Sequence, residues 1–225
     1  KKFKVSWGNY SSEEISLDKD SSNPKKGICV YAGKGRDTIT IKSSKDVKVS
    51  ADVVVYGGDG EDLIDASGLS LASDGNAILI GNGGLDVIKG AGGLGNNFIF
   101  GETARFVKDD DKVKLAEAYP DVASAETNVL FGGAGNNFIF GGAGSDILYA
   151  GDFADTTNYL FGDGGRVEID AQDLPVASRY DLFDEGGDDL IYGSEYSDCL
   201  YGGAGTDWIE GLGGDDEIYG GQGND

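Results

Sequence analysis

The sequence predicts an all-β fold, a parallel β-roll or β-helix solenoid, and three observations support that prediction. A nine-residue unit repeats in tandem, which is the signature of an architecture built from stacked turns. Glycine supplies 39 of the 225 residues while proline supplies 3, a composition that favours tight turns. The eighth position of every unit is Ile or Leu, as expected for a strand residue that faces a core.

The repeat is clearest near the end of the chain, where GGAGTDWIE occupies residues 202–210. Its pattern is G-G-x-G-x-D-x-U-x, in which U is a large aliphatic residue. The other copies lie at 32–40, 57–65, 81–89, 92–100, 132–140, 141–149, 184–192, 193–201 and 211–219. The eighth-position residues that we expect to form the core are Ile39, Ile64, Ile88, Ile99, Ile139, Leu148, Ile191, Leu200, Ile209 and Ile218.

The charge of the chain indicates its partner. There are 40 acidic and 18 basic residues, a net charge of −22, which opposes compaction unless something neutralises it. Divalent cations are suited to so many carboxylates, whereas nucleic acid requires basic patches. Histidine is absent, which excludes Ser-His-Asp catalysis and His-ligated metals. The sequence also lacks an apolar run of the length needed to span a membrane.

These units resemble the repeats of the RTX (repeats-in-toxin) family of secreted proteins, over roughly residues 27–225 with two interruptions. The resemblance implies several Ca²⁺ ions between turns one rung apart, bound by position-six carboxylates and glycine carbonyls. The ligands that it implies are Asp37, Gly58, Gly60, Asp62, Asp86, Asn97, Asn137, Gly142, Gly144, Asp146, Asp189, Asp198, Gly203, Gly205, Asp207, Asp216 and Asp225.

Two of these positions carry an amide instead of an acid. Asn97 and Asn137 stand in identical GNNFIFG runs. Asn can ligate Ca²⁺ through its carbonyl oxygen but brings no charge, so these two sites should be weak or empty. The alternative is an asparagine that hydrogen-bonds the turn.

The chain divides by its repeat pattern. We expect a cap, or the remnant of a preceding domain, at 1–26, then a solenoid with ~25-residue rungs at 27–101. Regular repeats follow at 128–165 and 184–225, with excursions at 102–127 and 166–183. The intervening segments 41–54 and 65–78 are either a third strand per rung or bulging loops.

Both excursions open alike, with Gly101-Glu102 followed by Arg105 and Gly162-Asp163 followed by Arg166. The second of them resembles a punctuating element of very large RTX proteins. A short helix is expected at 112–118, with Asp111 as its N-cap and Pro120 beyond its end. Excursions from a solenoid often carry binding functions.

The expected function is a calcium-binding structural or adhesive module that folds on binding Ca²⁺, within a larger secreted or cell-surface protein, and not an enzyme. The alternatives are an accessory domain of a secreted enzyme or toxin whose catalytic part lies outside this chain, and a carbohydrate-binding module. Position-nine tyrosines, such as Tyr149 and Tyr192, either bind sugars or stack on the outer face. Self-association into a filament is a further expectation.

Overall fold

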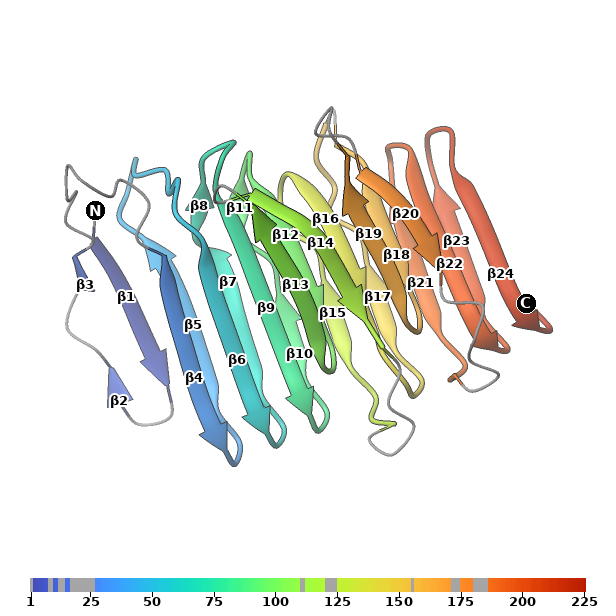
Figure 1. The fold of residues 1–225 in the computed structure, drawn as a ribbon, viewed down its shortest axis with the longest axis horizontal. Coiled ribbons are helices and arrows are strands. Elements are labelled where there is room, and N and C mark those ends of the chain that lie inside the picture. The colour runs from blue at the N-terminus through green and yellow to red at the C-terminus, as the bar shows by residue number, and fades with distance from the viewer. Residues whose placement is uncertain are drawn as a thin grey trace.

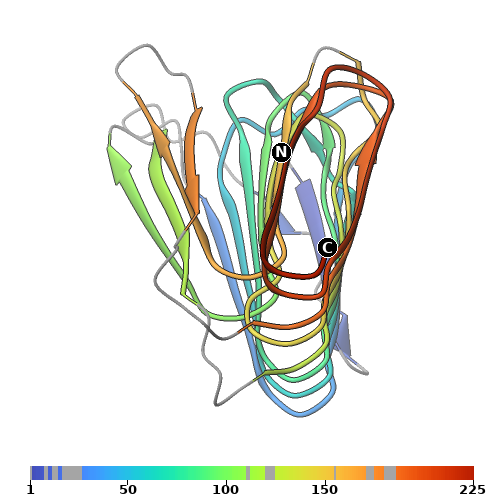
Figure 2. The same cartoon turned by 90° about the vertical axis from the view of Figure 1, so that its right-hand side faces the viewer.

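The computed structural model describes residues 2–7, 10–11, 15–16, 27–109, 112–119, 125–154, 156–170, 175–179 and 186–225. In Figure 1 the strands stack side by side along the long axis, from the N-terminus to the C-terminus. Viewed along that axis in Figure 2, successive coils superpose as flattened loops. The chain is therefore a two-sided solenoid over these segments, and the expectation of an all-β parallel roll is confirmed.

One side of the solenoid is a sheet of ten strands, ordered β2-β1-β5-β7-β10-β15-β17-β21-β23 with β3 against β1. We call it the first sheet. From β5 onward its neighbours are parallel. Its strands are β1 Lys2–Trp7, β2 Tyr10–Ser11, β3 Ile15–Ser16, β5 Thr38–Ser43, β7 Leu63–Gly68, β10 Val87–Lys89, β15 Val129–Phe131, β17 Ile147–Tyr149, β21 Leu190–Ser194 and β23 Trp208–Leu212.

The other side is an eight-stranded parallel sheet, ordered β24-β22-β18-β16-β12-β9-β6-β4. We call it the second sheet. Its strands are β4 Ile28–Lys34, β6 Val53–Asp59, β9 Asn76–Gly83, β12 Asn96–Phe100, β16 Asn136–Phe140, β18 Asn158–Phe161, β22 Asp198–Gly205 and β24 Glu217–Gly223.

The aliphatic core lies between the two sheets, because alternate strand residues point inward. Eight of the ten residues predicted from the eighth position are buried there, from Ile39 to Leu200. Ile209 is partly buried against the same cluster. Ile218 is the exception, at 48 % exposed, because β24 is the last strand of the second sheet and no further strand covers its residue.

The N-terminal rungs contain a short third strand. β8 Ser70–Leu71 pairs in parallel with β11 Gly92–Gly93, and Val49 bridges Leu71. Val49 and Leu71 are buried in the main core. Of the two expectations, a third strand of two residues is found in 65–78, whereas 41–54 contributes only the bridge at Val49.

The two excursions join into one accessory sheet. β13 Ala104–Asp109 and β14 Lys112–Ala118 form one antiparallel pair, and β19 Gly165–Ile169 and β20 Pro175–Arg179 form another. β14 and β19 then pair with each other. In Figures 1 and 2 these strands lie outside the solenoid, over the second sheet. The helix expected at 112–118 is wrong, because pairing of β14 on both sides overrides the local helix preference.

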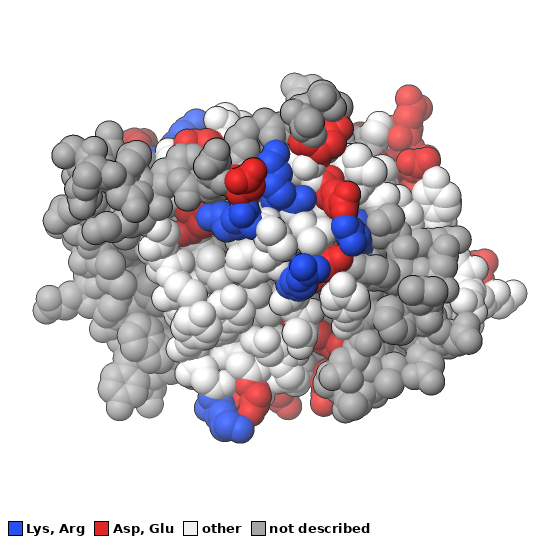
Figure 3. Space-filling view, viewed as in Figure 1, with Lys and Arg blue, Asp and Glu red and all other residues white. Residues whose placement is uncertain are grey.

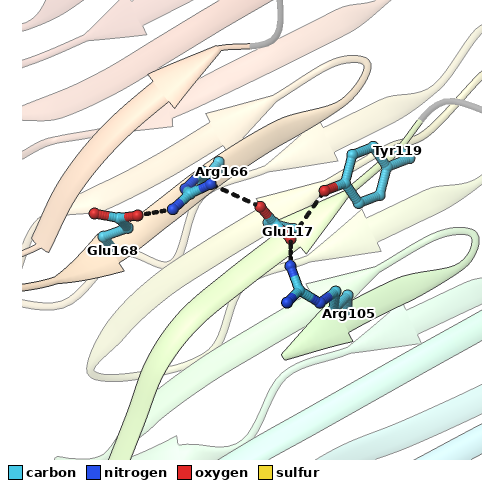
Figure 4. Close-up of polar contacts among 5 residues, drawn as sticks. All are labelled: Arg105, Glu117, Tyr119, Arg166 and Glu168. Carbon is cyan, nitrogen blue, oxygen red and sulfur yellow. Dashed lines mark hydrogen bonds and ion pairs between the residues drawn. The ribbon is translucent and has the colours of Figure 1, made fainter. Parts of the chain in front are cut away.

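The accessory sheet is held by an aromatic core and a buried charge. Phe100, Phe140 and Phe161 stack on one another at 4.9 Å between ring centroids, and β14 residues such as Ala116 pack against this cluster. Glu117 on β14 is buried and pairs with Arg105 on β13 and Arg166 on β19, at 2.7 and 3.1 Å. Figure 4 shows that Glu117 lies between the two guanidinium groups.

Charges of both signs lie on this face. Figure 3 shows Lys and Arg side chains interspersed with Asp and Glu over the accessory strands. Lys108 at the end of β13 pairs with Asp52, which precedes β6. The accessory sheet is therefore joined to the solenoid by this ion pair as well as by aromatic packing.

Candidate metal centre

A row of acidic side chains follows one edge of the solenoid, where each strand of the second sheet turns into the first. We call it the aspartate row. Each member after the first accepts a hydrogen bond from the backbone N–H of the preceding one through Oδ1, at 2.7 to 3.1 Å. The row consists of Asp37, Asp62, Asp86, Asn128, Asp146, Asp189, Asp207 and Asp225. Stacking of the rungs thus brings together carboxylates that lie 18 to 43 residues apart in sequence.

The second carboxylate oxygen in this row has no protein partner. The Oδ2 atoms of Asp62, Asp86, Asp146, Asp189 and Asp207 are buried and accept no hydrogen bond. A buried anionic oxygen without a partner is unfavourable by several kcal/mol in order of magnitude. Five repetitions of the same orphaned atom indicate that something cationic completes these turns.

Glycine carbonyl oxygens lie near the unpartnered Oδ2 atoms of the aspartate row. A Cβ built on Gly57 would lie 2.5 Å from Asp62 Oδ2 and 2.8 Å from the carbonyl oxygen of Gly81, one rung further on. The same overlap with an aspartate Oδ2 and a glycine carbonyl recurs at Gly81, Gly141, Gly162 and Gly202. Carboxylate and carbonyl oxygens are the ligands that Ca²⁺ takes, so the residues present fit that ion.

The electrostatics favour a cation. Burial raises the pKa of Asp86 to about 7 and that of Asp207 to about 6. Burial, with an added contribution from neighbouring carboxylates, raises the pKa of Asp146 to about 8 and that of Asp189 to about 10. Both causes oppose the charged form. At neutral pH the metal-free row therefore either holds protons or requires positive charge.

The glycines of the predicted ligand set have the expected backbone geometry. Positive φ values between 107° and 137° occur at the second and fourth turn positions. These residues are Gly58, Gly60, Gly142, Gly144, Gly203 and Gly205. An L-residue is strained in that region, so the turns that present the carbonyls depend on glycine.

The opposite edge, where the first sheet turns back into the second, has amides along most of its length. We call it the mixed row, and it consists of Asn97, Asn137, Asn158, Asp198 and Asp216. Strand pairing places the first four members side by side. At the end of the row, the N–H of Asp198 donates a hydrogen bond to Asp216 Oδ1 at 3.0 Å. Of the predicted ligands, Asp198 and Asp216 therefore lie away from the aspartate row.

The amide nitrogens of the mixed row use the oxygens that a cation would need. Asn97 Nδ2 donates to the carbonyls of Ala91 and Ala134, at 3.1 and 3.0 Å. Asn137 Nδ2 donates to Gly133 and Gly135, both at 3.1 Å. The structure thus favours the hydrogen-bonding alternative at Asn97 and Asn137, because an N–H₂ group takes the place of a metal ion there.

Sequence reasoning missed four residues of these rows and turns. Asn128 and Asn158 were overlooked because excursions or irregular segments replace the glycines before them. The signal was present, since TNVLFG at 127–132 and TNYLFG at 157–162 match the NNFIFG runs. Glu102 and Asp163 are buried at the starts of the excursions and carry acids at a position where the repeat has glycine.

Side chains alone do not build these sites. Among the described residues, no group of three or more His, Cys, Asp or Glu side chains could hold a metal. No helix in the described segments has the length and apolar character needed to cross a membrane.

Comparison with known proteins agrees with this geometry. The family model of the RTX calcium-binding nonapeptide repeat matches four times, over residues 50–68, 122–157, 182–205 and 192–225. No curated protein and no solved structure shows a significant match to the chain. Repeats of this family bind several Ca²⁺ ions. Over these residues the chain carries RTX calcium-binding nonapeptide repeats.

Proposed function

We propose that this chain is a structural or adhesive module of a secreted or cell-surface protein, and that at neutral pH it folds only when Ca²⁺ fills the aspartate row. The observation that supports this most directly is the set of buried, unpartnered Oδ2 atoms at Asp62, Asp86, Asp146, Asp189 and Asp207. The ions would be held by these oxygens and by the glycine carbonyls that converge on them.

The energetics favour a calcium-driven transition. Like charges a few ångströms apart cost on the order of a kcal/mol or more per pair, and the chain carries a net charge of −22. Extracellular calcium modules bind with constants of roughly 10⁻⁴–10⁻³ M. A tenfold excess over such a constant adds about 1.4 kcal/mol per site. Several sites together then match the stability of an ordinary domain.

Circular dichroism in EGTA and in millimolar CaCl₂ tests the proposal. We expect a disordered spectrum in EGTA and a β-rich spectrum after calcium is added, with full reversal on chelation. Mg²⁺ at the same concentration is the control, because it is smaller and releases its water reluctantly. An equally β-rich spectrum with and without calcium would refute calcium-driven folding.

The outer face of the first sheet supports carbohydrate binding as a second candidate function. Phe131, Tyr149 and Tyr192 stack along it, with centroid separations of 4.9 and 5.0 Å. Flat aromatic surfaces of this kind can stack on sugar rings, although cross-strand packing alone also explains them. A glycan array in calcium, with Tyr149→Ala as the comparison, distinguishes the two roles.

The domains encoded beside this chain distinguish the structural role from the accessory role. Whether the module serves an adhesive protein, a filament, or a secreted enzyme or toxin is decided by the domains encoded beside it. A catalytic or pore-forming neighbour in the full gene would favour the accessory role, and further repeats with excursions would favour the structural one.

A further inference from the structure

The outer face of the first sheet carries two columns of side chains that alternate with the buried core residues. Parallel pairing aligns both columns strand by strand from β7 to β23. One column is apolar throughout, from Leu63 on β7 to Trp208 on β23. From β10 to β23 the other column consists of Lys89, Phe131, Tyr149, Tyr192 and Glu210. We call these two columns the outer patch.

The outer patch is largely apolar and yet exposed. Trp208 is 60 % exposed, Leu190 is 37 % exposed and Tyr149 is 36 % exposed. On the other side of the solenoid the accessory sheet covers the aromatic residues of the second sheet, so Phe100 and Phe140 are fully buried (Figure 2). A contiguous exposed apolar patch on a soluble protein marks an interaction site.

The aromatic residues of the outer patch favour a protein partner. The rings of Phe131, Tyr149 and Tyr192 are nearly parallel, with interplanar angles of 4° and 10° and centroids 4.9 and 5.0 Å apart. Each ring therefore turns part of its face toward the neighbouring ring, which leaves less of that face for a sugar to stack on. Side chains of a second sheet can instead pack against the rings, as the facing side chains of two packed sheets do.

The charged residues at the two ends of the patch are held in place. Lys89 extends over the ring of Phe131, with Nζ 5.9 Å from the ring centroid. Glu210 accepts a hydrogen bond from the indole N–H of Trp208 at 2.8 Å. The patch therefore presents a cation at one end and an anion at the other, with aromatic rings between them.

This column is self-complementary about Tyr149. Phe131 and Tyr192 lie one strand away from it on opposite sides, and Lys89 and Glu210 lie two strands away. A two-fold axis along β17, between two copies packed face to face, places Lys89 opposite the partner's Glu210 and Phe131 opposite the partner's Tyr192. Such an interface uses the same patch on both copies, as closed dimers do.

The direction of the axis follows from the same charges. With the axis along β17, the apolar column also faces itself. An axis along the solenoid would instead lay the apolar column of one copy on the charged column of the other, with Lys89 against the partner's Val87. A charge that loses water without gaining a partner is unfavourable, so the axis along β17 is favoured.

The distribution of charge along the chain favours the same arrangement. Of the 18 basic residues, only Arg166 and Arg179 follow residue 114. The two-fold axis along β17 reverses the direction of the second solenoid. The acid-rich C-terminal half of each copy then lies toward the half of the partner that holds most of the basic residues, which is the complementary placement.

We propose that the outer patch binds a second copy of this chain, in a two-fold dimer whose axis runs along β17. The patch is only two side chains wide, so the interface belongs to the small, transient class. A dimer of that class forms at roughly 10⁻⁵–10⁻³ M protein. The patch exists only when the rungs are stacked, so the dimer requires the folded, calcium-loaded chain.

Sedimentation velocity in saturating calcium, from about 10 µM to about 1 mM protein, tests the dimer by charge reversal. Lys89→Glu and Glu210→Lys each place like charges opposite each other at both symmetric positions, and we expect each to weaken dimerisation by about tenfold or more. The double variant restores the pairs, and we expect its dimerisation to recover. Lys48→Glu, at an exposed position outside the first sheet, is the control for the change in charge. Circular dichroism in the same buffer shows whether each variant is folded.

Cross-linking tests the position of the axis. The background chain carries Cys29→Ser and Cys199→Ser, which remove both native thiols. Tyr149→Cys in this background should be joined to its own copy by a short bismaleimide, because Tyr149 lies on the axis. Trp208→Cys is the control on the same face. It lies two strands from β17, so the two copies of this residue are about 19 Å apart at ~4.8 Å per strand.

The outcomes separate this inference from the proposed function. A folded wild-type chain that stays monomeric at about 1 mM would overturn the dimer and leave calcium-dependent folding intact. A monomer that binds glycans through Tyr149 would overturn it as well and assign the patch to carbohydrate. A double variant no tighter than the single variants, or equal cross-linking at Tyr149→Cys and Trp208→Cys, would overturn the proposed axis. A chain without β-structure in calcium would overturn both the dimer and the proposed function.

Discussion

The backbone N–H of Asp146 donates a hydrogen bond to Asp189 Oδ1 at 2.7 Å, although 43 residues separate the two in sequence. The second excursion leaves and returns between them. The next bond in the row, from Asp189 N–H to Asp207 Oδ1, measures 2.9 Å and spans 18 residues. The aspartate row therefore continues past the insertion unchanged, and the stacked rung, rather than the spacing in sequence, sets the geometry of the metal sites.

Asp189 and Asp188 provide a matched pair for testing the row. Asp189 is fully buried with an orphaned Oδ2, whereas its neighbour Asp188 is exposed. In saturating calcium, Asp189→Asn should lower the free energy of unfolding by about 1–3 kcal/mol, because one ion loses a charged ligand. Asp188→Asn should change it by no more than about 0.5 kcal/mol. Urea titrations measure both, and equal effects would count against a metal role for Asp189.

The raised carboxyl pKa values predict how the metal-free chain responds to pH. Asp86, Asp146 and Asp189 have pKa values well above the ordinary 3.8, at about 7, 8 and 10. Between the ordinary value and these raised values the folded chain binds more protons than the unfolded chain, so the free energy of unfolding rises as the pH falls. In calcium-free buffer we expect β-structure to increase between about pH 8 and pH 5.

Circular dichroism against pH measures this response, in buffer depleted of calcium by a chelating resin because EGTA weakens in acid. Exposed carboxylates also repel one another less as they become protonated over part of this pH range. Asp189→Asn separates the two effects, since removal of the group with the highest pKa should shift the upper end of the transition to lower pH. Loss of β-structure on mild acidification would contradict the prediction. Calcium affinity should fall over the same range, because protons compete for the ligands.

The part of this fold that was predictable from sequence is the part that repeats. Ile64 and Ile88 could be placed in the core because the eighth position recurs at a fixed offset from the glycines, and that offset fixes the direction of the side chain. The accessory sheet could not be predicted in this way. KVKLAEA at 112–118 consists mostly of good helix formers, and only its pairing with β13 and β19 makes it a strand. Asn128 was missed for a similar reason, because an excursion replaces its glycines.

Asn137 offers the converse experiment, in which a metal site is created. Its Nδ2 donates to the carbonyls of Gly133 and Gly135 and to Asn158 Oδ1. Asn137→Asp replaces that donor with a carboxylate oxygen that faces these three acceptors, while the other oxygen keeps the N–H of Gly133. At the lowest calcium concentration that keeps the wild-type chain folded, we expect a loss of about 1–3 kcal/mol in stability. At saturating calcium we expect the loss to disappear and an additional ion to bind.

Calcium counting and urea titration in both conditions test Asn137→Asp, and Asn224→Asp at an exposed position is the control for added charge. Equal destabilisation at low and at saturating calcium would show that the turn at Asn137 cannot accept an ion. That result would leave the aspartate row as the calcium-binding edge of this part of the solenoid.

Glu117 should control the accessory sheet without controlling the solenoid. Its carboxylate is buried between Arg105 and Arg166 and accepts a hydrogen bond from the hydroxyl of Tyr119 at 3.0 Å. Glu117 therefore joins the two excursions across the pairing of β14 with β19 (Figure 4). Glu117→Gln removes the charge that both guanidinium groups face. Because both arginines are partly exposed, we expect a cost of about 1–3 kcal/mol rather than that of a fully buried pair.

Hydrogen exchange in saturating calcium locates that cost. Amides of β14 and β19 should lose protection in Glu117→Gln, while amides of β16 in the second sheet should keep theirs, because local opening requires less free energy than global unfolding. Glu168→Gln is the matched control, since Glu168 is a partly exposed partner of Arg166 and its loss leaves the pairing of Glu117 in place. Equal loss of protection in β16 would mean that the accessory sheet and the solenoid unfold as one unit, and that the two excursions are integral to the stability of the coil.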